Sequence, residues 1–262
     1  MTGRTLQVEP RARVGDVGSY VQALRDLGAA GFDRPLWFRG HRNARYRLQA
    51  SALREAKFAA NEVPMLKRFM QDARPRLSEA PTSEWDWLLL AQHHGVPTRL
   101  LDWSENALIG LYFACEGEER RLDGTPEPDG DVWVLMPERL NAEAGTWAAQ
   151  HKEDLPFLSV DAGLDKYSPF TPLPRGETLR HVAVIASRNF PRIISQWGTF
   201  TVTGDEIAIE DLAQAERFLM RIQVDGEAKL QILEELSSLG IEERVVYPDL
   251  HRLGRRVKEM FS

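Results

Sequence analysis

The sequence predicts a single α+β domain in which helices flank a mixed β-sheet, either continuous or split. Helical segments and short strand segments follow one another without the regular strand–helix alternation of a doubly wound parallel sheet. The chain has 262 residues, 43% of them hydrophobic and 27% charged, which is enough to bury one sizeable core. It has no internal repeat or low-complexity linker, so we expect one domain over 14–262 after a loose arm at 1–13.

The helical segments are recognised by apolar residues three or four positions apart and by the residues that end them. Residues 14–31 carry this spacing and stop at Gly28 and Gly31. Ser83 is placed to cap a helix that Gly95 ends. Further helices are expected at 53–77 with a break at Pro64, 105–119, 227–240 and 247–262.

The strand segments are short runs rich in β-branched and aromatic residues, several of them bounded by Gly or Pro. They lie at 35–40, 131–137, 181–187, 198–204 and 216–224, with weaker candidates at 46–53, 96–103 and 240–250. The stretch from about 140 to 178 is rich in Pro and Gly and has no clear period. We therefore expect it to be an excursion within the domain.

The composition disfavours several classes of protein. A net charge of −6 and an acidic pI do not favour binding to nucleic acid or to an anionic membrane. Cys115 is the single cysteine, which excludes an internal disulfide and fits a reducing cytosol. No segment approaches the ~20 apolar residues that a membrane span needs. We therefore expect a cytoplasmic protein with no membrane partner.

The densest set of polar residues lies in the segment 91–114, between two apolar helices. It comprises Gln92, His93, His94, Arg99, Asp102 and Ser104. Ser104 or Asp102 is placed to cap the second helix, which would direct backbone N–H groups toward a ligand. The structural alternative is that Asp102 only caps and Arg99 only pairs with it. We favour a ligand-binding role for this segment.

His93 and His94 do not indicate a metal site. Neighbours on a helix point about 100° apart, so they cannot chelate together as residues four apart can. We therefore expect no bound metal. One of the two histidines is a candidate general acid or base that faces the cleft, and the other packs.

A second candidate group ends the aromatic segment at 35–40. Arg39 offers planar, paired donors suited to phosphate or carboxylate, although Asp102 or Asp86 could hold it in a structural ion pair. Gly40 allows a ligand or another backbone to come close. A basic cluster follows, made of His41, Arg42, Arg45 and Arg47. This cluster is consistent both with a nucleotide phosphate and with a solvated face.

Two later stretches carry further candidates. Gln196 precedes Trp197, and an amide beside an aromatic ring suits a nicotinamide or a base, although it is also typical of packing. Glu242 and Glu243 precede a β-branched run, where Glu243 is either solvated or catalytic.

Several of these stretches resemble the FRG domain family, which is named for the triplet Phe38-Arg39-Gly40. The segments 91–114, 190–202 and 236–257 are also similar to this family, so the resemblance covers roughly 15–260. It implies a bacterial or phage-associated protein with a link to phage-defence or toxin-like loci.

The chain is more distantly similar to mono-ADP-ribosyltransferases, which place an Arg-Gly at a strand end, where the Arg contacts NAD. A Ser-containing strand and a late Glu follow in those enzymes. Arg39 and Ser104 match the first two features, whereas Arg244 stands at the expected Glu position and Glu243 would serve after a shift of one residue. The resemblance implies an ADP-ribosyltransferase-like core, NAD as substrate and a protein or nucleic acid as acceptor.

Three hypotheses follow. In the first, a nucleotide-like ligand such as NAD binds between Arg39 and the segment 93–104, and Glu243 stabilises a cationic ribosyl centre. In the second, the protein is a metal-independent nuclease that uses His93 or His94 with Arg39 and Arg99. In the third, it is a non-enzymatic sensor or protein-binding module that uses the same cleft.

Overall fold

The computed structural model describes residues 8–31, 35–117, 127–144, 154–172, 179–204 and 206–249, and residues 254, 257, 258 and 261 near the C-terminus. The strands are β1 (Pro10–Val14), β2 (Trp37–His41), β3 (Leu100–Ser104), β4 (Gly130–Leu135), β5 (Val182–Val184), β6 (Gly198–Val202) and β7 (Leu219–Val224). The α-helices are α1 (Val17–Ala29), α2 (Ala56–Ala59), α3 (Glu62–Ala73), α4 (Glu84–His93), α5 (Ala107–Cys115), α6 (Pro137–Ala144), α7 (Pro191–Ser195), α8 (Lys229–Ser238) and α9 (Glu243–Val246).

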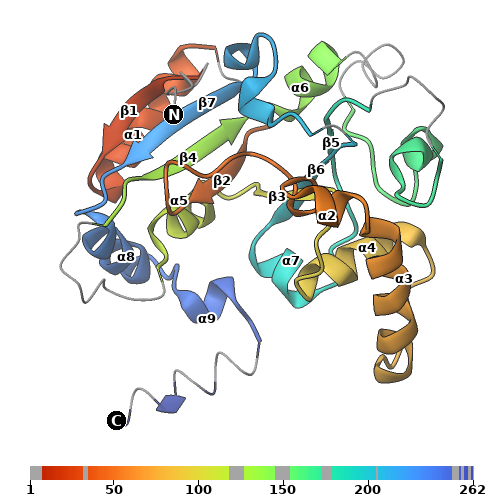
Figure 1. Cartoon of the computed structure of the whole chain (residues 1–262). Coiled ribbons are helices and arrows are strands. Elements are labelled where there is room, and N and C mark those ends of the chain that lie inside the picture. Colours follow the sequence, from red (N-terminus) through yellow and green to blue (C-terminus); the bar gives the residue numbers. More distant parts are fainter. Residues whose placement is uncertain are drawn as a thin grey trace.

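The strands form one mixed sheet in the order β1-β7-β4-β2-β3-β6-β5, flanked by helices (Figure 1). β1 runs parallel to β7, and all other neighbours in the sheet are antiparallel. The prediction of an α+β domain with a mixed sheet is confirmed. No helix in the described ranges is both long and apolar enough to cross a bilayer.

The sheet has the fewest paired residues at its centre, where β2 lies beside β3. These two strands pair at a single position, Phe38 with Ser104, whereas β2 pairs with β4 over five positions and β3 with β6 over five. β2 and β3 diverge beyond this pair. The sheet is therefore continuous in its hydrogen bonding but consists of two halves that are barely joined.

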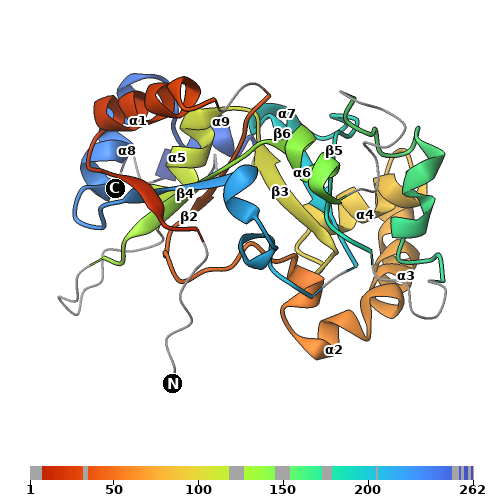
Figure 2. The same ribbon diagram turned by 90° about the horizontal axis from the view of Figure 1, so that it is seen from above.

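Each half of the sheet contributes most to its own apolar cluster. Residues of β1, β7, β4 and β2 pack with α1, α5 and α8, which lie together on one side of the sheet (Figures 1 and 2). Residues of β3, β5 and β6 pack with α4 and with Leu158, Leu164 and Tyr167. The described part of the expected excursion at 140–178 thus supplies core residues.

Glycines allow α5 to lie directly on the backbone of the sheet. A Cβ at Gly40 would stand 2.2 Å from the Gly110 carbonyl oxygen, and one at Gly130 would stand 2.5 Å from the Ala114 carbonyl oxygen. From the helix side, a Cβ at Gly110 would stand 2.7 Å from Phe38 Cβ. Gly40 is therefore explained by the approach of another backbone, which is one of the two alternatives that the sequence left open.

The expected loose arm is wrong for residues 10–13, because they pair with β7 as part of β1. Residues 1–7 lie outside the described part of the chain. β1 is stabilised by hydrogen bonds to the backbone of β7, and its own sequence has no pattern that predicts a strand.

Three smaller expectations are also corrected. The segment 46–53 alternates like a strand, but the Leu48 amide bonds to the Glu210 carboxylate and the Ala52 amide to the Thr98 carbonyl. The segment 240–250 contains one helical turn, α9, in place of a strand. Pro64 does not break a helix, because it lies in the first turn of α3, where an N–H has no intrahelical partner. Most of the helix expected at 247–262 lies outside the described residues.

Replacement of Gly40 by Ala tests the contact between α5 and β2. The new Cβ would meet helix backbone that cannot move aside without repacking, so we expect Gly40→Ala to lower the free energy of unfolding by about 3 kcal/mol or more. Gly28→Ala in α1 is the control, because its Cβ would meet nothing within 4 Å, and it should change stability by less than about 1 kcal/mol. Chemical denaturation measures both. Equal stabilities of Gly40→Ala and wild type would contradict the close approach.

Candidate functional site

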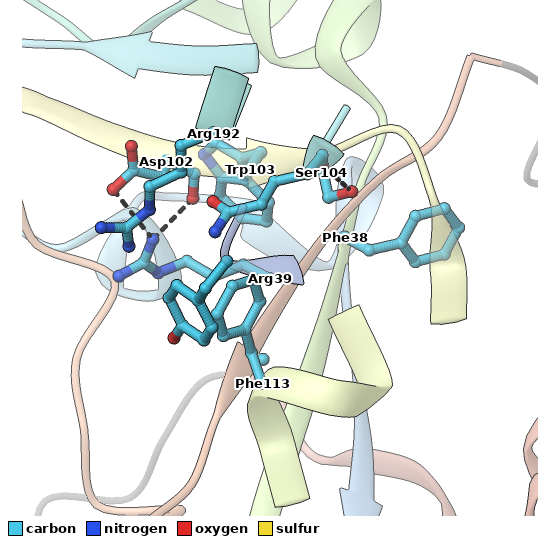
Figure 3. Close-up of a pocket in the computed structure, with 10 residues that line it drawn as sticks. Phe38, Arg39, Asp102, Trp103, Ser104, Phe113 and Arg192 are labelled. Carbon is cyan, nitrogen blue, oxygen red and sulfur yellow. Dashed lines mark hydrogen bonds and ion pairs between the residues drawn. The ribbon is translucent and has the colours of Figure 1, made fainter. Parts of the chain in front are cut away.

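A pocket of about 280 Å³ opens where β2 and β3 diverge, and we call it the split pocket (Figure 3). Its lining residues are Phe38, Arg39, Gly40, Asp102, Trp103, Ser104, Phe113, Arg192, Gln196 and Tyr247. Five of the residues predicted to bind a ligand therefore line one pocket. These are Arg39, Gly40, Asp102, Ser104 and Gln196.

Arg39 bridges the two strands at the point where they part. Its Nη1 donates to the Asp102 carbonyl oxygen at 2.6 Å and lies 3.9 Å from the Asp102 carboxylate (Figure 3). Its Nε donates to Nε2 of His41 at 3.1 Å. The guanidinium thus satisfies a backbone carbonyl in the region where the ladder between β2 and β3 has ended. Desolvation lowers the pKa of Arg39 to about 10, with Asp102 opposing the change, so the side chain stays charged at neutral pH.

Asp102 presents an exposed carboxylate whose orientation is fixed by Gln92. The Gln92 Nε2 donates to Asp102 Oδ1 at 2.6 Å, and its Oε1 accepts from Thr98 Oγ1 at 2.5 Å. Gln92 does not itself line the split pocket, so it acts there through Asp102. The side chain of Asp102 is 60% exposed, which leaves it accessible from the pocket.

Neither Asp102 nor Ser104 caps the following helix, which corrects the expectation from the sequence. Both belong to β3, and Asn106 caps α5 by accepting from the Leu108 amide at 2.9 Å. The Ser104 hydroxyl donates to the Gln196 carbonyl at 2.6 Å and accepts from the Asn106 amide at 3.0 Å. The Gln196 Nε2 donates to the Val246 carbonyl at 3.0 Å. Ser104 and Gln196 therefore hold the wall of the pocket together.

Five lining residues were not among the predicted site residues, namely Phe38, Trp103, Phe113, Arg192 and Tyr247. The Arg192 guanidinium carbon lies 5.2 Å from the centre of the Tyr247 ring, and that ring meets Phe113 edge-to-face at 6.0 Å. The Tyr247 hydroxyl donates to Glu116 Oε2 at 2.7 Å, which fixes the ring. Arg192 and Tyr247 lie inside the segments 190–202 and 236–257 that resemble the FRG family, but nothing in their local pattern places them beside β2.

Arg99 and His94 do not line this pocket. Arg99 pairs with the buried Glu62 at 2.7 Å and donates to the Tyr167 carbonyl at 2.9 Å, so it ties β3 to α3 and to the second cluster. His94 is exposed at the end of α4, where its ring lies 6.0 Å from that of Phe69. The alternative pairing of Arg99 with Asp102 is therefore wrong.

His93 and Glu243 are near the split pocket without lining it. His93 borders a smaller cavity of about 60 Å³ that shares Asp102, Arg192 and Gln196 with the split pocket. Burial, and then the charges of His94 and Arg192, lower the pKa of His93, which keeps it neutral at neutral pH. Glu243 begins α9 but is absent from the pocket lining. Among the described residues, no group of three His, Cys, Asp or Glu side chains could hold a metal ion.

A second pocket of about 520 Å³ adjoins the first, and we call it the arginine pocket. It shares Arg39, Gly40 and Phe113 with the split pocket and adds His41, Arg42, Arg45, Tyr46, Arg47, Gln49 and Arg54. His41 is 4% exposed. Burial, followed by the charges of Arg39 and Arg54, holds the pKa of His41 well below its usual range, so the ring is neutral and accepts from Arg39.

Residues 34–122 match the model of the FRG domain. The match spans β2 to α5 and includes Arg39 and Asp102, so the chain contains an FRG domain. No curated protein and no solved structure matches the chain significantly. None of these findings concerns mono-ADP-ribosyltransferases, and that resemblance stays a prediction.

The depressed pKa of His41 predicts a pH dependence of stability. In the unfolded state the His41 imidazole binds a proton near pH 6.5, whereas in the folded state it stays neutral at that pH. The free energy of unfolding should therefore fall as the pH drops below about 6.5. The limiting slope from one such group is about 1.4 kcal/mol per pH unit. His41→Gln should flatten this slope in denaturant titrations between pH 7 and 5. An unchanged slope in His41→Gln would contradict the assignment.

Proposed function

We propose that this FRG-domain protein binds a nucleotide-like ligand, NAD, in the split pocket. The observation that carries the proposal is the position of Arg39, where an aromatic-walled pocket meets an arginine-lined one. Ligand sites of this kind combine apolar walls with a few convergent polar groups. A planar ring fits against Phe113 and Tyr247, with Arg39 and Asp102 facing the ribose.

The pocket also supports cleavage of the bond between nicotinamide and ribose. Asp102 carries the one carboxylate among the residues that line it. In the proposed reaction the bond from ribose C1′ to the nicotinamide nitrogen breaks, and water or an acceptor hydroxyl adds to C1′ and releases one proton. The cationic ribosyl centre is stabilised by a nearby carboxylate. Asp102 takes this role in place of Glu243, because Glu243 is not part of the pocket lining.

The other two hypotheses receive less support. A nuclease built on Arg99 is disfavoured, since Glu62 and the Tyr167 carbonyl already engage that side chain. A sensor or protein-binding module would use the same pocket without turnover. A role in phage defence or as a toxin rests on the resemblance alone and is compatible with an activity that consumes NAD.

Replacement of Arg39 tests binding. We expect Arg39→Ala to weaken NAD binding about tenfold or more, because one charged hydrogen-bond donor is worth about 1.5–3 kcal/mol. Titration calorimetry measures the affinity, and near-ultraviolet circular dichroism checks that the variant is folded. Arg68→Ala on α3 is the control, because its guanidinium is exposed and pairs only with Asp72 among the described residues. Equal binding by Arg39→Ala and wild type, or none by wild type, would remove the proposal.

Replacement of Asp102 separates binding from turnover. Asp102→Asn keeps an oxygen for Gln92 but loses the negative charge, so NAD should still bind while nicotinamide release falls about a hundredfold or more. Nuclear magnetic resonance follows nicotinamide directly, with and without a bacterial lysate as source of acceptor. Absence of release by wild type in both conditions would leave ligand binding as the function. Full release by Asp102→Asn would exclude Asp102 from the chemistry.

A further inference from the structure

The arginine pocket concentrates positive charge in a protein whose net charge is −6. Five arginines line it, from β2, from the loop that follows β2 and from the turn before α2, namely Arg39, Arg42, Arg45, Arg47 and Arg54. Like charges brought together cost free energy unless a counter-charge or water relieves them. The positive charge that remains for a ligand therefore depends on which arginines the protein's own carboxylates neutralise.

Carboxylates account for only part of this charge. Arg47 pairs with both Glu210 and Asp211, and Arg39 lies 3.9 Å from the Asp102 carboxylate. Within the described ranges, no carboxylate pairs with Arg45 or Arg54. The Arg54 Nε donates to the Gln49 carbonyl at 3.0 Å, and no described residue accepts from its two terminal nitrogens. Two guanidinium groups at this pocket thus retain donors for an external anion.

The backbone around these arginines is held in place before any ligand arrives. The Ala44 amide donates to the Asp129 carbonyl at 2.8 Å, and the Arg45 amide to Asn43 Oδ1 at 3.0 Å. Lys229, which is 4% exposed, donates from Nζ to the Arg42 carbonyl at 2.6 Å. A fixed loop loses less entropy when it binds, so the pocket is preorganised for an anion.

The field of the arginines reaches the floor of the pocket. Desolvation is the main cause that lowers the pKa of Arg39 and of the buried His41, and the charge of Arg54 lowers both further. A ligand anion in the pocket would offset this repulsion. Guanidinium groups also match phosphate oxygens with paired donors, which lysine cannot do.

We propose that the arginine pocket is a diphosphate-binding site, with Arg45 and Arg54 as the residues that grip the anion. The proposal rests on the proposed function for its biological ligand, because the split pocket beside it would hold the ribose and ring of the same dinucleotide. It names the ligand class as a dinucleotide with a bridging diphosphate, in preference to a nucleoside or a nucleobase.

Inorganic pyrophosphate is the direct probe. By titration calorimetry at moderate salt, wild type should bind it, and the double variant Arg45→Gln/Arg54→Gln should bind about tenfold more weakly or worse. Both side chains are exposed, so the variant should fold normally. The matched control is Arg68→Gln/Arg217→Gln, which removes two exposed, ion-paired arginines elsewhere and should bind like wild type. No pyrophosphate binding by wild type, or an equal loss in the control, would overturn the proposal.

Two further arms separate this proposal from the proposed function. Wild type should bind NAD about tenfold or more tightly than nicotinamide riboside, and the double variant should bind the two alike. If wild type binds pyrophosphate but not NAD, and the double variant loses pyrophosphate binding, the diphosphate site is supported and the NAD proposal is removed. If wild type and the double variant bind NAD with equal affinity, the NAD proposal stands and the diphosphate site is removed.

A nucleic acid offers the same phosphate chemistry from another source. A single-stranded hexanucleotide that displaces pyrophosphate from wild type, while NAD does not, would assign the arginine pocket to nucleic acid and overturn the diphosphate assignment. Failure of the hexanucleotide to compete at concentrations where NAD competes supports it.

Discussion

The close contact of α5 with β2 and β4 is the constraint on which both pockets depend. Gly40 and Gly130 let sheet and helix touch through backbone atoms, and Gly110 leaves room on the helix for the Cβ of Phe38. This contact holds α5 close to β2, so Phe113 lies next to Gly40 and lines both pockets. A larger residue at any of the three positions would lift the helix and widen the place where Arg39 and Phe113 meet.

The divergence of β2 and β3 opens the split pocket beside this contact. A sheet that paired fully along these strands would have no opening between Arg39 and Asp102. Because pairing stops at Phe38 and Ser104, the Asp102 carbonyl needs another donor, and Arg39 supplies it at 2.6 Å. The same side chain thus bridges the diverging strands and lines the split pocket. Replacement of Arg39 is expected to affect both stability and the proposed ligand binding, so the variants at Arg45, Arg54 and Asp102 test the proposed binding and turnover more specifically.

Local sequence pattern predicted five of the ten residues that line the split pocket, and four of the five lie in two short, distinctive segments. The aromatic run before Arg39 and the polar segment at 92–104 indicated residues that face one cleft, and Gln196 comes from a third segment. The α+β class followed from the mixture of helical and strand segments without regular alternation.

The errors have a common physical cause, which is that long-range partners decide what a local pattern becomes. The sequence left open a pairing of Arg99 with Asp102, but Arg99 pairs with Glu62 of α3, which precedes it by 37 residues. Tyr247 and Arg192 approach each other only because α7 and α9 pack together, and β1 forms because β7 offers a free edge. Residues 46–53 alternate like a strand but find side-chain and loop partners for their amides.

The two proposed binding sites are tested most directly by a crystal structure of the protein with ADP-ribose bound. We expect the ribose between Arg39 and Asp102 in the split pocket, and the diphosphate among the arginines of the arginine pocket. ADP-ribose bound elsewhere on the molecule, with both pockets empty, would contradict both proposed sites.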